Sequence, residues 1–159
     1  MVLSRVEEAA DACRNVLRLN PNDADACLAL GWAHYHMKKY ADSVTEYGRA
    51  IALGKDTAEA QYGLGSSLLE CDRIADALVS FERATQMRPD WAEAYCAIGS
   101  TYLLLGQLEQ AMEAYQRALE LDFRLKDAHG GLMQTYRSMR KWRDLWKHAV
   151  KLLRSKEVS

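Results

Sequence analysis

The most reactive side chains in this sequence are thiols and imidazoles, and their spacing argues against a metal site. Zinc needs thiolates or imidazoles clustered at ligand spacing. The four cysteines stand apart, with no C-x-x-C pair, at Cys13, Cys27, Cys71 and Cys96. His34 and His36 are two residues apart, so a helix would point them to different sides, whereas a helical metal pair prefers a spacing of four. We therefore predict no metal.

The other residues with catalytic potential are interpreted as structural. We expect packed imidazoles at His34 and His129, and surface imidazoles at His36 and His148. Gly63 with Gly65, and Gly130 with Gly131, are predicted to allow close helix packing, because a phosphate-binding glycine loop would follow a strand. The chain has no G-x-S-x-G, H-E-x-x-H or P-loop motif. We predict no enzyme activity and no cofactor.

The composition of the 159 residues is that of a globular protein. Hydrophobic residues make up 49% and charged residues 27%, and 21 Lys and Arg nearly balance 22 Asp and Glu. A net charge of −1 excludes a strongly basic nucleic-acid binder. No apolar run reaches the roughly 18 residues of a membrane span, and no secretory signal is visible. Together with cysteines expected as reduced, packed thiols, these features favour a cytoplasmic protein.

A period of 34 residues runs through the sequence. It relates Leu30-Gly31, Leu64-Gly65 and Ile98-Gly99, and also Tyr47, Phe81 and Tyr115. Within one period, small and apolar residues of 93–105 fall on one helical face, and 109–121 carry a second apolar stripe. Gly106 is predicted to end the first of these helices. Because one helix pair cannot bury both its faces, the units must stack.

This pattern resembles the tetratricopeptide repeat, whose signature is W-x2-L-G-x2-Y, then A-x3-F, then P. The third repeat matches it best, with Tyr95, Ile98-Gly99, Tyr102, Ala111, Tyr115 and Ala118. The resemblance implies an all-α, right-handed solenoid of stacked helix-turn-helix repeats. It divides a single array, 1–159, into a leading half repeat, three full repeats and a divergent fourth, at 5–23, 24–57, 58–91, 92–125 and 126–157. The half repeat would lack its first helix, so the chain could be a fragment of a longer array.

In this family the first helices line a concave surface, roughly at the second, fifth, ninth, twelfth and thirteenth positions of each repeat. The resemblance thus implies a partner-binding set of Asp25, Leu28, Trp32, Tyr35, Glu59, Tyr62, Ser66, Leu69, Glu93, Cys96 and Leu103. Trp32 is the central candidate, because the register keeps it out of the core and an exposed Trp is a frequent binding anchor. The alternative is that Trp32 packs on the preceding helix, 5–19.

The acidic second positions of the repeats also have two interpretations. They either complement the helix dipole in the first turn or form a ladder for a basic partner. One branch of the family clamps the acidic C-terminal tails of heat-shock chaperones with Lys and Asn at fixed positions. Here those positions include Leu28, Trp32 and Glu93, so the cations of the clamp are missing. The asparagine ladder of sugar-transferase repeat arms is missing too. The other predicted lining residues are small, apolar or aromatic, and the acidic second positions lie among them. Such a surface suits an amphipathic or basic-apolar segment.

Residues 137–156 form a basic segment with eight Lys and Arg and one acid. Its apolar residues form a helical stripe of Trp142, Leu145, Trp146, Ala149, Leu152 and Leu153. Either this helix packs inward with a solvated basic face, or it meets a membrane surface or an acidic partner. Few residues remain for a capping helix, so uncovered apolar ends could drive formation of a homo-oligomer.

These features predict a non-enzymatic scaffold or adaptor that holds a protein partner, as a peptide or amphipathic helix, in the concave groove. One alternative is a regulatory arm of a larger enzyme such as a transferase. Another is a dedicated chaperone for an exported or membrane protein. Nucleic-acid binding is disfavoured, because residues 1–136 are acidic and phosphate contacts need cations along the groove.

Overall fold

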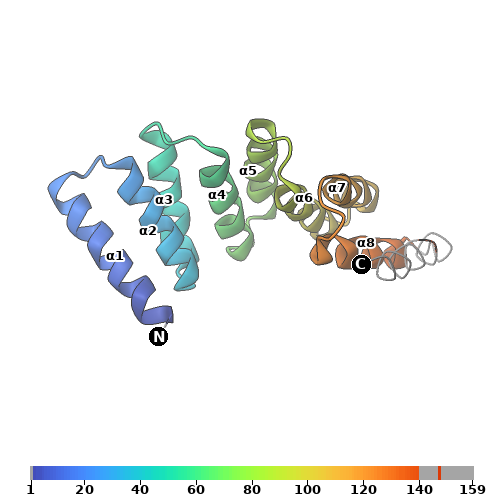
Figure 1. The fold of residues 1–159 in the computed structure, drawn as a ribbon, viewed down its shortest axis with the longest axis horizontal. Helices are drawn as coiled ribbons and strands as arrows, with labels where there is room; N and C mark the ends of the chain where they lie inside the picture. The colour runs from blue at the N-terminus through green and yellow to red at the C-terminus, as the bar shows by residue number, and fades with distance from the viewer. Residues whose placement is uncertain (1, 140–146, 148–159) are drawn as a thin grey trace. The chain divides into compact units, whose positions relative to one another are not determined.

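The computed structural model describes residues 2–139 and 147, and each element in this range is an α-helix (Figure 1). The helices are α1 (Val2–Leu19), α2 (Ala24–His36), α3 (Tyr40–Ala52), α4 (Ala58–Glu70), α5 (Ile74–Met87), α6 (Ala92–Leu104), α7 (Leu108–Leu121) and α8 (Lys126–Ser138). Stacked pairs of neighbouring helices confirm the predicted all-α solenoid class. The apolar stripe expected from Trp142 to Leu153 lies outside the described residues.

The chain consists of two compact units. The first, Met1–Pro89, holds α1 to α5, and the second, Asp90–Ser159, holds α6 to α8 among its described residues. In the first unit α2 pairs with α3 and α4 with α5, while α1 packs on α2 and α3 packs on α4. In the second unit α6 pairs with α7, and α8 packs on both.

The ends of the helices follow from local residue chemistry. The carboxylate of Asp23 accepts the N–H of Ala26 at 2.9 Å, which satisfies one of the unpaired donors at the start of α2. After α6, Gly106 has a φ of 72°, as expected for a glycine that stops a helix. The matching turns of the two preceding repeats place Lys38 and Asp72 at a φ of 59°. The left-handed turn is therefore a property of the repeat, whether or not glycine occupies it.

In the first unit, the ring of Tyr47 from α3 fills the space between α2 and α4. A β-carbon on Gly31 would lie 3.1 Å from that ring, and one on Gly63 would overlap it. Gly65 likewise faces an aromatic ring of α5. The hydroxyl of Ser43 donates to the carbonyl of Gly31 at 2.7 Å, so the buried polar group is paired. The predicted close packing at Gly63 and Gly65 is confirmed.

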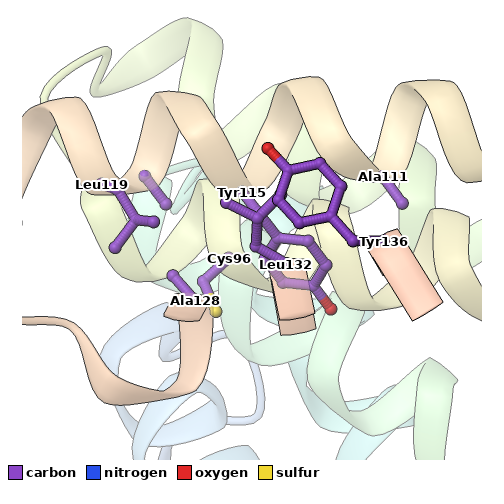
Figure 2. Close-up of a cluster of buried hydrophobic side chains, with 8 residues drawn as sticks. Cys96, Ala111, Tyr115, Leu119, Ala128, Leu132 and Tyr136 are labelled. Atoms are coloured by element: carbon purple, nitrogen blue, oxygen red, sulfur yellow. The ribbon is translucent and has the colours of Figure 1, made fainter. Parts of the chain in front are cut away.

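In the second unit, Tyr115 of α7 has the same position between α6 and α8. The surrounding core, drawn in Figure 2, consists of Cys96, Ala111, Tyr115, Ala118, Leu119, Ala128, Leu132 and Tyr136. A β-carbon on Gly99 would come within 2.8 Å of the Tyr115 ring, and one on Gly131 would overlap it. Close packing is thus confirmed at Gly131. It is wrong at Gly130, where a β-carbon would meet open space, because this residue points away from the core.

Helix α1 is covered on one side, chiefly by α2. Val6 and Ala10 are buried with Leu30 of α2. By contrast, Leu19 near the end of α1 is 84% exposed and Val16 is also exposed. Ala50, which stands one period after Val16 on α3, is fully buried, because α3 has helices on more than one side.

Candidate functional site

Trp32 is the largest apolar side chain exposed on α2. Half of its surface (50%) is accessible, and its ring packs on that of His36 with centroids 4.3 Å apart. The spacing of four residues puts both rings on one side of the helix. Trp32 is outside the buried cluster between α1 and α2, so the register-based expectation of an exposed Trp is met. His36 is exposed, as predicted.

Three helices meet at the C-terminal end of α2. The ring of Tyr35 lies edge-on to His36 and to Tyr40, the first residue of α3, with centroids 5.6 Å apart in each case. The carboxylate of Glu70, the last residue of α4, lies close enough to Tyr40 to influence its hydroxyl. Burial, followed by the nearby Glu70 carboxylate, raises the pKa of both tyrosines. Both phenols therefore remain protonated and able to donate at neutral pH.

The other apolar residues expected on this side of the first unit, Leu28, Tyr62 and Leu69, are half-buried. Tyr62 has its ring 5.4 Å from that of Phe81 on α5. Ser66 is also half-buried, and its hydroxyl already donates to the Tyr62 carbonyl at 2.9 Å. The repeat register predicts that these mainly apolar and aromatic residues share one surface with Trp32.

The predicted acidic residues of the first unit are in ion pairs with cations at the ends of the second helices. Asp25 lies 2.6 Å from Lys55, which follows α3, and Glu59 pairs with Arg88, which ends α5. Exposed pairs of this kind contribute little stability, about 1 kcal/mol or less. The pairing favours the structural interpretation of these two carboxylates. Glu93 in the second unit is exposed.

The expectation that Cys96 lines an open surface is wrong. Its side chain is only 8% exposed and packs in the core with Ala128 and Leu132 of α8. Burial, with the carboxylates of Asp127 and then Glu93, raises the pKa of Cys96 to about 11. The small thiol is covered by α8, which the repeat register alone does not reveal. Leu103 is half-buried against the same core.

We define the aromatic–acidic cluster as Trp32, Tyr35, His36, Tyr40 and Glu70. The predicted set contained only the first two of these residues. His36 and Glu70 each stand at the thirteenth position of a repeat, which is a lining position and was a usable signal. Tyr40 begins a second helix, so no rule about lining positions selects it.

The other candidate chemistry is structural. His34 is buried, as predicted, and His129 is buried with its Nε2 at 2.7 Å from the Phe123 carbonyl. His148 lies outside the described residues. Across residues 2–139 and 147, no group of three His, Cys, Asp or Glu side chains could hold a metal ion. In the same range, no helix has both the length and the apolar character needed to cross a membrane. The cysteines of this range are free, with Cys27 and Cys96 buried and Cys13 and Cys71 half-buried.

Paired helices with aromatic rings seated on glycines define a helical-repeat protein. Models of the tetratricopeptide repeat match residues 4–68, 58–90 and 92–123. The chain therefore belongs to the tetratricopeptide repeat family. A fold of this family supports a protein–protein interaction scaffold. A search of curated protein sequences found no match.

Solved structures with the same fold include MamA and YrrB. A MamA crystal structure has a TM-score of 0.90 and 25% identity, over 97% of this chain and 84% of that one. MamA from Desulfovibrio magneticus RS-1, from residue 41 to its end, has a TM-score of 0.89 and 25% identity, over 97% and 87%. YrrB, described as a TPR protein with an unusual peptide-binding site, has a TM-score of 0.77 and 21% identity, over 96% and 76%. At that identity, the likeness to YrrB shows the fold alone.

Proposed function

We propose that this protein is a non-enzymatic scaffold that holds a peptide or amphipathic helix of a protein partner. The proposed contact surface is the side of the first unit that carries Trp32 and, by the repeat register, Leu28, Tyr35, Tyr62 and Leu69. The observation that carries the proposal is the half-exposed ring of Trp32, supported on its own helix by His36. The peptide-binding description of YrrB adds support at the level of the fold.

A rigid aromatic ring is an effective binding anchor. It buries a large area and loses little conformational entropy on binding, since it rotates about only two side-chain bonds. The tilted contact with the His36 ring restricts Trp32 further before any partner arrives. The half-buried aromatic and aliphatic side chains nearby would accept the apolar residues of a bound segment, as in helix-in-groove recognition.

The test compares partners captured by the intact chain and by a double variant, Trp32→Ala with Tyr62→Ala. Lysate proteins retained by each bait are quantified by mass spectrometry. We expect the partners enriched on the wild type to fall at least about tenfold on the variant, because both anchors are removed. A partner set that is unchanged on the folded double variant would contradict the proposal.

The matched control is Val79→Ala. Val79 is 56% exposed on α5, so this change removes exposed apolar surface elsewhere in the same unit. We expect it to retain the same partners as the wild type. Circular dichroism melts of all three proteins establish that the helices are folded. A partner that is insoluble unless it is co-expressed with this chain would favour the chaperone alternative. We also propose a cytoplasmic location, on the basis of the free cysteines.

A further inference from the structure

We propose that the aromatic–acidic cluster recognises a lysine or arginine side chain on the partner segment, so that the protein selects basic-apolar peptides. This inference rests on the proposed function and adds the chemistry of one residue in the ligand. The cationic head would lie against the faces of the exposed rings and meet the carboxylate of Glu70. The apolar part of that Lys or Arg side chain, together with the neighbouring residues of the peptide, would cover Trp32.

The ring arrangement suits a cation. The ring of Trp32 contacts that of His36 with centroids 4.3 Å apart, and the ring of Tyr35 contacts those of His36 and Tyr40 at 5.6 Å each. The faces of Trp and Tyr rings carry negative potential and attract ammonium and guanidinium groups within about 6 Å of the centroid. Because Trp32 is half exposed and Tyr35 and Tyr40 are only half-buried, ring surface remains accessible to a ligand.

Glu70 supplies the formal charge. It is exposed, and the ion pairs formed among the described residues do not include it. The neighbouring phenol of Tyr40 is neutral at pH 7, so it leaves the charge of the carboxylate uncompensated. Nearby Arg73 is already paired with Asp76 at 2.6 Å. A carboxylate of this kind can accept a further charge-assisted hydrogen bond.

Helix polarity adds to the negative potential. Glu70 ends α4, and the last turn of α4 holds no basic residue to offset the negative end of the helix dipole. Helix α2 packs against α4, and its last turn holds Tyr35. Besides the paired Arg73, Lys38 and Lys39 are exposed in the turn after α2. An acidic ligand could use these lysines, and the test includes that outcome.

The experiment selects ligands from a displayed library of random dodecapeptides on the wild-type chain. The expected peptides carry Lys or Arg next to aromatic or aliphatic residues. Selected peptides are synthesised in two forms, with the cation and with Gln in its place. Affinities are measured by fluorescence anisotropy for the wild type, Glu70→Gln and a control, Glu113→Gln, which changes an exposed acid of α7 in the second unit.

We expect Glu70→Gln to weaken binding of the cationic peptide by about tenfold, and Glu113→Gln to leave it unchanged. The Gln peptide should bind the wild type about tenfold more weakly than the cationic peptide does. Glu70→Gln should not lower the affinity for the Gln peptide any further, because the peptide cation and the Glu70 carboxylate act as a pair. Raising the salt concentration should lower the affinity of the cationic peptide more for the wild type than for Glu70→Gln.

Selection of peptides without cations or rich in Asp and Glu, or full affinity of Glu70→Gln, would overturn this inference. A Trp32→Ala variant distinguishes failure of the cation site from failure of the proposed function. If selected peptides lose affinity with Trp32→Ala but not with Glu70→Gln, the binding surface stands and only the cation site is wrong. If no peptide is selected, or Trp32→Ala has no effect, both proposals fail.

Discussion

The face formed by α2 and α4 in the first unit and the face formed by α6 and α8 in the second follow the same repeat register but differ in what they expose. At the ninth position of a repeat the first face holds Trp32, which is half exposed. At the same position the second face holds Ser100, whose hydroxyl accepts a hydrogen bond from Tyr115 at 3.0 Å. At the fifth position, Cys96 is buried in the core.

The difference shows that equivalent positions of the repeat can be open in one unit and covered in the other. A thiol or hydroxyl is short enough to be covered by the next helix or to bond with the ring beneath it. The indole of Trp32 is not covered in this way and stays half exposed. The register of a helical repeat therefore predicts direction, whereas accessibility depends on the volumes of the neighbouring side chains.

The largest expected effect is a difference in the free energy of unfolding between substitutions on the two faces. Tyr115 is 2% exposed and packs on α6 and α8, so Tyr115→Ala should lower the free energy of unfolding by about 3–5 kcal/mol. Trp32→Ala should lower it by less than about 1 kcal/mol, since the ring is half in water. Urea denaturation followed by circular dichroism measures both. Equal losses would mean that Trp32 is a core residue and would remove the contrast.

Two adjacent glycines in α8 sharpen the comparison within the second unit. Gly131→Ala should destabilise the protein by about 1–3 kcal/mol, because the new β-carbon overlaps the ring of Tyr115. Gly130→Ala should stabilise it by about 0.5–1 kcal/mol, because alanine favours the helix and meets open space. Thermal melts of the two variants provide the check. The same sign for both would show that the ring of Tyr115 yields to the added methyl group.

The smallest expected effect concerns reactivity. With its pKa raised to about 11, Cys96 at pH 8 has about one thiolate in a thousand, and the folded core also blocks access. Iodoacetamide should label half-buried Cys71 well before Cys96, as peptide mass mapping would show. Cys71→Ser is the control for assignment. Rapid labelling of Cys96 in the folded protein would place it on an open surface after all.

The same shift predicts a pH dependence of stability. The unfolded Cys96 thiol loses its proton from about pH 9, the ordinary value, whereas the folded thiol keeps it until about pH 11. The folded state thus binds more protons between these values, and stability contributed by this group falls as the pH rises through that window. Cys96→Ala should reduce the decline measured by urea denaturation between pH 9 and 11.

Much of the fold could be predicted because it depends on local periodicity. The 34-residue spacing, the apolar stripes and the glycine at 106 identified paired helices and a helix stop. The site was predicted less completely. The exposure of Trp32 follows from the register and its role in binding stays a prediction, whereas Cys96 is buried because the covering contact comes from α8, about thirty residues later. Tyr40 was missed, because it joins the cluster from the start of a second helix.

By itself, the sequence determined the helical repeat, the family and the outward direction of Trp32, because each depends on spacing within one or two helix pairs. Only the tertiary structure decided which lining residues are open, that Asp25 and Glu59 are paired, and that Glu70 lies beside Tyr35 and Tyr40. These facts depend on contacts between helices that are distant in the chain. Periodicity fixes the face of each helix, but the packing of neighbouring side chains fixes what that face can bind.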